Sequence, residues 1–425
     1  MYISLSNRGA ADRGTTPGAA LSPGRPAATR VSSVVIALGI VSLVTDVSSE
    51  SVSAILPLYI TGVLGLSTVA YGFLDGIYQG VSAVVRIAGG WAADRGDQPK
   101  WIAFFGYGLS ALARTGLLFA TGFTSLVAVI TVDRLGKGVR TAPRDALITA
   151  SSLPENLGRS FGVHRMLDTV GAAVGPLVAF AILFAIPDGY DTVFVVSLAF
   201  AIVGVFVLGL IVPNTRPSAA RAAPGTSRAS FRWAQLRDPR LRRLLLTAGL
   251  LGIVTIGDGF IYLVLQSRDA FAAAWFPLLY VGTNVAFLLL AIPLGRFADR
   301  FGRARVFVCG HLALLTAYVC AAVPVAGLPT TILCLIALGV FYASTDGILA
   351  ALASQSTPEA SRATAIASAQ TVVAVTRLIA STGFGLLWFA VGRGTAMMII
   401  AGALALLIPL AALVLRGAFA RVQTT

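Results

Sequence analysis

The sequence predicts an all-α membrane protein with twelve spanning helices, and three observations carry that prediction. Apolar residues make up 56% of the 425 residues against 12% charged, and the mean hydropathy is +0.84. Several apolar runs, such as residues 192–212 and 394–415, carry no charge over the roughly 20 residues that a spanning helix needs. Positive residues, finally, gather in alternate connections between the runs. The composition lies outside the range of soluble domains.

The apolar runs and the turn signals between them place the helices in order. The first six are expected near residues 33–60, 67–92, 101–121, 125–151, 161–186 and 192–212, and the second six near 243–265, 274–295, 306–326, 330–353, 363–389 and 394–415. The fourth and fifth helices carry many charges, so a hydropathy window alone would miss them. The alternation of inner and outer loops along the chain supports their assignment as spanning helices.

The distribution of Lys and Arg predicts that both termini are cytoplasmic. With that orientation, 22 of the 32 basic residues lie in the tails and inner loops, eight lie within helices, and two, Arg268 and Arg393, lie outside. The net charge of +14 therefore follows from topology. A nucleic-acid partner is not needed to explain it.

The chain divides into two similar halves. We expect a disordered cytoplasmic tail over 1–32, six helices over 33–212, an arginine-rich cytoplasmic linker over 213–242, six helices over 243–415 and a second tail over 416–425. An Asp-Arg turn follows the second helix and recurs after the eighth. The repeated motif consists of Gly90, Asp94 and Arg95 in one half and Gly295, Asp299, Arg300, Gly302 and Arg303 in the other. An internal duplication explains this pattern.

With these features, the sequence resembles the major facilitator superfamily of secondary transporters. The segment from Gly295 to Arg303 matches the loop signature of that superfamily, and Gly171 with Gly175-Pro176 resembles, in shortened form, a motif of its antiporters. Residues 45–50 and 136–145 resemble a branch of bacterial and archaeal members. The resemblance implies two six-helix halves, a prokaryotic cytoplasmic membrane, and transport without a cofactor.

The fourth predicted helix holds six charged side chains within residues 132–148. Asp133, Lys137, Arg140 and Arg144 recur at a spacing that puts them on one stripe, at about 3.6 residues per turn. A charge facing lipid at the bilayer centre costs roughly 2.5–3.5 kcal/mol on insertion scales. The stripe must therefore face water or protein, and we expect it to line the transport path.

Acidic residues on other predicted helices can pair with these bases. The sequence places eight acids and eight bases within the predicted spans, thirteen of the sixteen in the first half. Buried charges must be paired, so one alternative is a permanent ion-pair network that never meets a substrate. The other is a functional site.

If these charged residues form a functional site, individual roles can be assigned to them. The resemblance suggests that Arg134 pairs with a carboxylate of the first helix, which makes Asp46 or Glu50 the candidate proton carrier. Lys137, Arg140 and Arg144 are candidates for binding an anionic group. The remaining cavity candidates are Asp75, Gln79, Asp133, Asp145, His164, Arg165 and Asp168.

A divalent metal at His164, Asp168, Asp46 and Glu50 is a weaker alternative, because no cysteine or second histidine joins them. Cys309, Cys320 and Cys334 lie in apolar runs and are expected to be buried and inert. Gly72, Gly76 and Gly80 form a ridge that predicts close packing against another helix. We therefore predict no metal site.

No enzyme motif is present, so we predict a transporter and not an enzyme. The first expectation is a monomeric, proton-coupled transporter of a small anionic or zwitterionic molecule, with export favoured over import. The alternatives are an efflux pump for lipophilic cations and a lipid flippase with the same fold.

Overall fold

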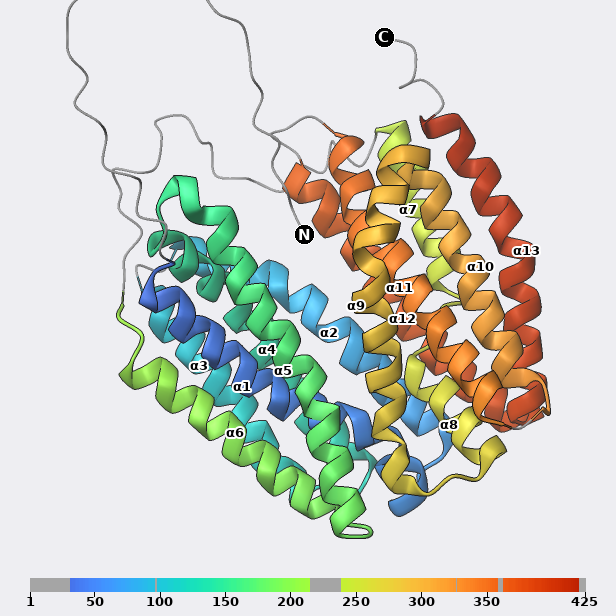
Figure 1. The fold of residues 1–425 in the computed structure, drawn as a ribbon, viewed down its shortest axis with the longest axis horizontal. Coiled ribbons are helices and arrows are strands. Elements are labelled where there is room, and N and C mark those ends of the chain that lie inside the picture. Colours follow the sequence, from blue (N-terminus) through green and yellow to red (C-terminus); the bar gives the residue numbers. More distant parts are fainter. Residues whose placement is uncertain (1–30, 96–97, 215–237, 326, 358–361, 420–425) are drawn as a thin grey trace, which may run out of the picture.

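A computed structural model describes residues 31–95, 98–214, 238–325, 327–357 and 362–419, and it is built almost entirely of α-helices (Figure 1). The first bundle contains α1 (Ser33–Leu58), α2 (Thr68–Arg95), α3 (Pro99–Leu117), α4 (Phe123–Ala150), α5 (Leu157–Ala185) and α6 (Tyr190–Leu210). The second contains α7 (Pro239–Gly252), α8 (Asp258–Asp269), α9 (Pro277–Phe301), α10 (Arg303–Ala322), α11 (Leu328–Gln355), α12 (Arg362–Val391) and α13 (Arg393–Phe419). Short helical turns at Tyr59–Val63, Pro154–Asn156 and Ala273–Trp275 join some of them.

Eight helical stretches of the described residues are long and apolar enough to cross a membrane. They include α1, α5 and α6 in the first bundle and α9 to α13 in the second, so the prediction that hydropathy alone would miss the fifth helix is wrong. The charge-rich α4 is not among them, as its composition leads one to expect. The chain is therefore a multi-pass membrane protein whose least apolar helices lie beside more apolar ones.

The seventh predicted helix, residues 243–265, is wrong as a single helix. The structure divides it into α7 and α8, separated by residues 253–257, which gives thirteen α-helices in the described chain. The Tyr318 hydroxyl of α10 donates to the Val254 carbonyl at 2.9 Å and accepts from the Ile256 amide at 3.0 Å. These bonds satisfy backbone groups that a continuous helix would pair internally, so the break is stable inside the bundle.

The predicted tails and linker lie mostly outside the described residues. Within the described part, Asp238 caps the N-terminus of α7 through a bond from the Arg240 amide, so this helix begins before the predicted position 243. The last helix continues to Phe419 and includes residues assigned to the C-terminal tail.

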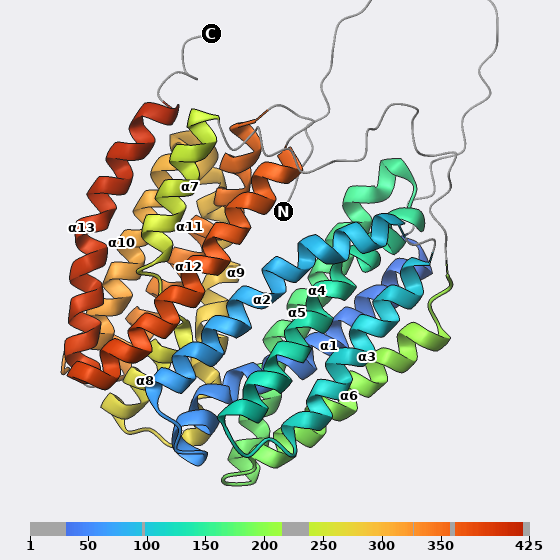
Figure 2. The same ribbon diagram turned by 180° about the vertical axis from the view of Figure 1, so that it is seen from behind.

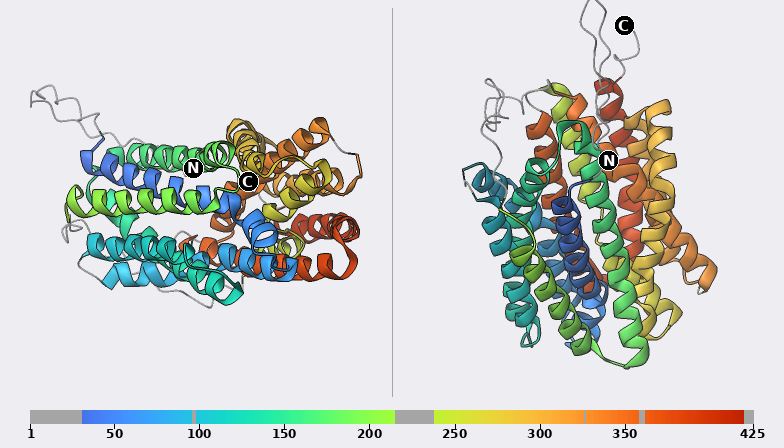
Figure 3. Two further views of the ribbon diagram at one scale, coloured as in Figure 1. Left: turned by 90° about the horizontal axis from the view of Figure 1, so that it is seen from below. Right: turned by 60° about the vertical axis from the view of Figure 1, so that its left-hand side comes forward.

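The two bundles differ in how their helices pack. In the first, α1 contacts α5 and α6, and α4 contacts α2 and α3. Gly171 and Gly175 let α5 approach the α1 backbone, since a Cβ at either position would clash with it. In the second, α11 contacts α9, α10 and α12. Figure 3 shows the two bundles side by side when seen from below.

The two bundles meet toward one end and diverge toward the other (Figures 1 and 2). The main contact is α2 against α12, with α5 against α9 and α1 against α8 and α9. Thr68 Oγ1 at the start of α2 donates to the Gly385 carbonyl of α12 at 3.0 Å. The prediction that the glycine ridge packs closely against another helix is confirmed, because a Cβ at Gly72 or Gly76 would clash with α12.

We predict that Gly72→Val destabilises the protein by about 1–3 kcal/mol, because the new side chain would collide with the Ser381 carbonyl of α12. The measurement is the melting temperature of the purified protein. Gly108→Val on α3 is the matched control, because a Cβ there meets nothing within 4 Å. Equal shifts in the two variants would contradict close packing at Gly72.

Candidate functional site

A buried ion cluster joins α3 to α4. Asp133 is 3% exposed, and its carboxylate accepts hydrogen bonds from Arg114 Nη2 at 3.0 Å and from Arg134 Nε at 3.0 Å. The Arg134 guanidinium also lies 3.7 Å from the centre of the Tyr78 ring. Both arginines are almost fully buried. One carboxylate thus holds two cations, and the aromatic face adds stabilisation for one of them.

This geometry corrects two expectations. Arg134 pairs with its neighbour Asp133 and not with a carboxylate of the first helix. Asp133 and Arg140 are buried, so neither faces an open path. Arg140 packs against the Tyr107 ring, with 4.3 Å from the guanidinium carbon to the ring centre. The stripe on α4 therefore has one edge against α3 and another edge that faces α1 and α5.

Lys137 lies on that second edge and faces both first-helix carboxylates. Its Nζ is 3.8 Å from Glu50 Oε1 and 3.9 Å from Asp46 Oδ1. The side chains of Lys137 and Glu50 are 30% and 28% exposed, and that of Asp46 is 12% exposed. Asp46 and Glu50 stand one turn apart on α1, so both can reach one ammonium group. The cluster has two acids and one base, and it is open to a solute or to water.

A third cluster surrounds Arg144. Its guanidinium lies 3.1 Å from Asp145, 3.8 Å from Asp168 and 3.2 Å from Ser42 Oγ. Ser42 in turn donates to Asp168 at 2.6 Å. Asp168 also pairs at 3.2 Å with Arg165, whose side chain is 78% exposed. This cluster ties α4 to α1 and α5.

His164 lies on the same turn of α5 but is 3% exposed, and neither ring nitrogen has a hydrogen-bond partner in the described structure. Among the described residues, no group of three His, Cys, Asp or Glu side chains could hold a metal ion. The metal alternative therefore gains no support from this geometry.

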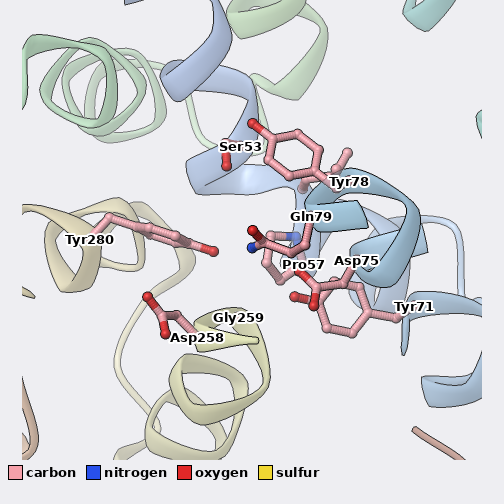
Figure 4. Close-up of a pocket in the computed structure, with 10 residues that line it drawn as sticks. Ser53, Pro57, Tyr71, Asp75, Tyr78, Gln79, Asp258, Gly259 and Tyr280 are labelled. Carbon is pink, nitrogen blue, oxygen red and sulfur yellow. The ribbon is translucent and has the colours of Figure 1, made fainter. Parts of the chain in front are cut away.

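A small cavity of about 60 Å³ lies between the two bundles (Figure 4). Asp75 and Gln79 of α2, both predicted as cavity residues, line it together with Tyr71 and Tyr78. The other bundle contributes Asp258 and Gly259 of α8 and Tyr280 of α9. Ser53, Leu56 and Pro57 of α1 complete the lining.

Three residues that line this cavity, Asp258, Tyr71 and Tyr280, are not among the cavity residues predicted from the sequence. The available signal was the segment Gly257-Asp258-Gly259, in which an acid stands between two glycines inside an apolar run. Asp258 begins α8, and its carboxylate accepts a hydrogen bond from the Tyr342 hydroxyl at 2.7 Å. Asp75 accepts one from Ser381 Oγ at 2.6 Å. Each carboxylate thus has a neutral donor.

The loop motif of the second half closes a turn between α9 and α10. Arg303 donates to Asp299 at 2.7 and 2.9 Å, and Gly302 takes a φ of +101°, which favours glycine. Arg300 lies over the Phe301 ring, and Gly295 lies within α9. Gly90, Asp94 and Arg95 form the last turns of α2, and their side chains lie outside the described part of the structure.

A membrane protein of two helical bundles, with an ionisable cluster on one bundle and a polar cavity between the two, belongs to the class of multi-helix transporters. The family model of the Major Facilitator Superfamily matches residues 38–283 and 268–422, and the chain belongs to that superfamily. Its members are transporters and not enzymes.

Two relatives and one solved structure are similar to this chain. An MFS-type transporter of Methanocaldococcus jannaschii is 28% identical over 83% of this chain and 87% of its own length. The multidrug resistance protein MdtH of Photorhabdus laumondii is 33% identical over 149 residues, or 35% of each chain. The solved peptide transporter POT superimposes with a TM-score of 0.77 over 93% of this chain and 96% of its own, at 16% identity.

We predict that Asp133→Asn destabilises the protein by about 3–5 kcal/mol, because two buried guanidinium groups would lose their only ion-pair partner in the described structure. Thermal melting of the purified protein measures this effect. Asp145→Asn, with a carboxylate that is 43% exposed, should cost about 1 kcal/mol or less. A larger loss in Asp145→Asn than in Asp133→Asn would contradict the prediction.

Proposed function

We propose that the protein is a proton-coupled secondary transporter of a small zwitterionic solute in the cytoplasmic membrane of a prokaryote. It crosses the membrane twelve times, with α7 and α8 together forming one crossing, and both termini are cytoplasmic. It acts as a monomer and exports its solute. The observation that carries this proposal is the partly exposed ion cluster of Lys137, Asp46 and Glu50.

Proton coupling follows from the composition of that cluster. Lys137 balances one of the two carboxylates that flank it, so the cluster has a charge of −1 when all three groups are ionised. Protonation of Asp46 or Glu50 would bring this charge to zero. Since charge is costly within a membrane, the two protonation states differ in the surroundings that they tolerate. A proton can therefore be exchanged when the halves rearrange.

Movement between two orientations requires halves that can separate. The contacts between them concentrate along the first part of α2 and the adjoining ends of α5 and α9. Rocking of one half against the other would open this end and close the opposite one. This is the general mode of action of two-repeat transporters.

The charges of the accessible surfaces favour a solute that carries both signs. Arg140, expected to bind an anion, is buried, which leaves Lys137 and Arg144 for that role. Asp75 and Asp258 line the cavity between the halves. A simple anion would be repelled there, whereas a zwitterion can place a different group at each location.

Export is supported by the α5 glycines and by the relative named for multidrug resistance. Gly171, Gly175 and Pro176 form the shortened antiporter motif, and the two glycines lie directly against α1. The second candidate function is efflux of a lipophilic cation. The acidic lining of the cavity favours it over transport of an anion.

Asp46→Asn and Glu50→Gln should each abolish proton movement driven by solute, because each removes one titrating carboxylate beside Lys137. The assay uses proteoliposomes with a trapped pH dye and separate pools of amino acids, organic anions and lipophilic cations. Glu155→Gln, in the exposed turn before α5, is the matched control and should behave like the wild type.

The amino-acid pool and the cation pool have distinct meanings in this assay, and proton movement with the organic-anion pool alone would contradict a solute that carries a positive group. Proton movement with the amino-acid pool alone supports a zwitterionic solute, and movement with the cation pool alone supports multidrug efflux. Unchanged coupling in both carboxylate variants would exclude Asp46 and Glu50 as proton carriers.

A further inference from the structure

The cavity between the halves has an unusual charge environment. Both charged residues in its lining, Asp75 and Asp258, are acids, and each comes from a different half. Figure 4 shows their carboxylates on opposite sides of the space, with the Tyr280 hydroxyl and the Gln79 amide pointing toward each other. Neither acid has a basic partner within 4 Å among the described residues. Buried charges are normally paired, so this lining lacks a cation.

Arg377 of α12 is a basic side chain that acts electrostatically on both acids without pairing with either. It lies over the Tyr342 ring, with 5.9 Å from the guanidinium carbon to the ring centre. Tyr342 itself stands between this guanidinium and Asp258, to which it donates a hydrogen bond. Arg377 therefore compensates the acids only at a distance and leaves the inside of the cavity negative.

The break in the seventh helix would ordinarily offer a site for an anion. The N-terminus of a half-helix carries a partial positive charge, and broken helices in transporters use it to bind anionic groups. Here the protein fills that position itself. Asp258 occupies the first turn of α8, and the Asp75 carboxylate lies so close to Gly257 that a Cβ at Gly257 would clash with it. An anion has no place left at this end.

The remaining walls suit a cationic nitrogen. Tyr71, Tyr78 and Tyr280 line the cavity, and the Ser53 hydroxyl, the Tyr280 hydroxyl and the oxygen of the Gln79 amide can accept hydrogen bonds from an ammonium group. The Tyr78 ring already contacts one cation outside the cavity, the Arg134 guanidinium, whose carbon lies 3.7 Å from the ring centre. A volume of about 60 Å³ fits an ammonium head group or a few water molecules, and not an entire solute.

We propose that this cavity is the subsite for the primary ammonium group of the transported solute, held between Asp75 of one half and Asp258 of the other. The inference rests on the proposed function and specifies the positive group of its zwitterionic substrate. Because the two carboxylates belong to different halves, the bound ammonium joins the halves at the end where they meet.

The test measures equilibrium binding without any gradient, so its result does not depend on proton coupling. Methylammonium chloride is added to the purified protein, and the rise in melting temperature is compared with that in sodium chloride at equal ionic strength. We expect a saturable rise with methylammonium that is weakened about tenfold or more in Asp75→Asn and Asp258→Asn, each of which removes half of the charge that holds the cation. Asp191→Asn, at the exposed start of α6, is the control for the same chemical change and should keep the full response.

Three outcomes would overturn the subsite. The first is an equal shift with methylammonium and with sodium, and the second is a methylammonium shift that persists in both variants. The third is stabilisation by sodium alone, which would indicate a metal-ion site. Asp258→Glu keeps the charge and should retain part of the response, which separates loss of the subsite from loss of folding. A protein that binds methylammonium without moving protons would contradict the proposed coupling and leave the subsite intact.

Discussion

The cost of placing ionised groups inside a membrane determines how the first half is built. Asp133 can exist at 3% exposure only because Arg114 and Arg134 reach it from two helices. That reach requires α3 and α4 to lie close together, and Gly106 and Gly136 allow it, since a Cβ at either position would clash with the opposite backbone. With this edge of α4 fixed against α3, the opposite edge presents Lys137 and Arg144 to α1 and α5. The accessible site is thus a consequence of the buried one.

The cost of unpaired polar groups inside a membrane also determines how the second half is built, although few charges are present there. A break in a spanning helix exposes backbone groups, and the structure satisfies several of them with the Tyr318 hydroxyl and with backbone turn bonds such as that from the Phe260 amide to the Gly257 carbonyl. The break brings the start of α8 against α2 and places Asp258 opposite Asp75. The interruption of one helix therefore supplies the acidic side chain that the second half contributes to the cavity.

The sequence could predict the helices because length, hydropathy and loop charge are local properties. It could also predict that Lys137 and Arg144 need partners, since their spacing on one helix is fixed. It could not predict that Arg134 turns to Asp133 while Lys137 faces Asp46, because that choice depends on how α4 is rotated between α1 and α3. The break near Gly257 was hidden as well. Residues 253–256 are largely apolar, and Tyr318, which stabilises the break, lies on another helix.

Binding of a cation in the cavity becomes linked to the arrangement of the two halves if the two carboxylates of the cavity must be neutralised together. Asp75 and Asp258 approach each other only while the halves are in contact at this end, and two like charges in a small cavity repel each other. A cation between them would remove that repulsion in the closed arrangement and would gain nothing comparable once the halves separate. Its differential affinity for the two arrangements then biases the equilibrium between them. The Lys137 cluster lies wholly within the first half, so its pairing does not require contact between the halves. If both proposals hold, the two sites respond to different steps of one cycle, the cavity to occupancy by the solute and the cluster to the proton.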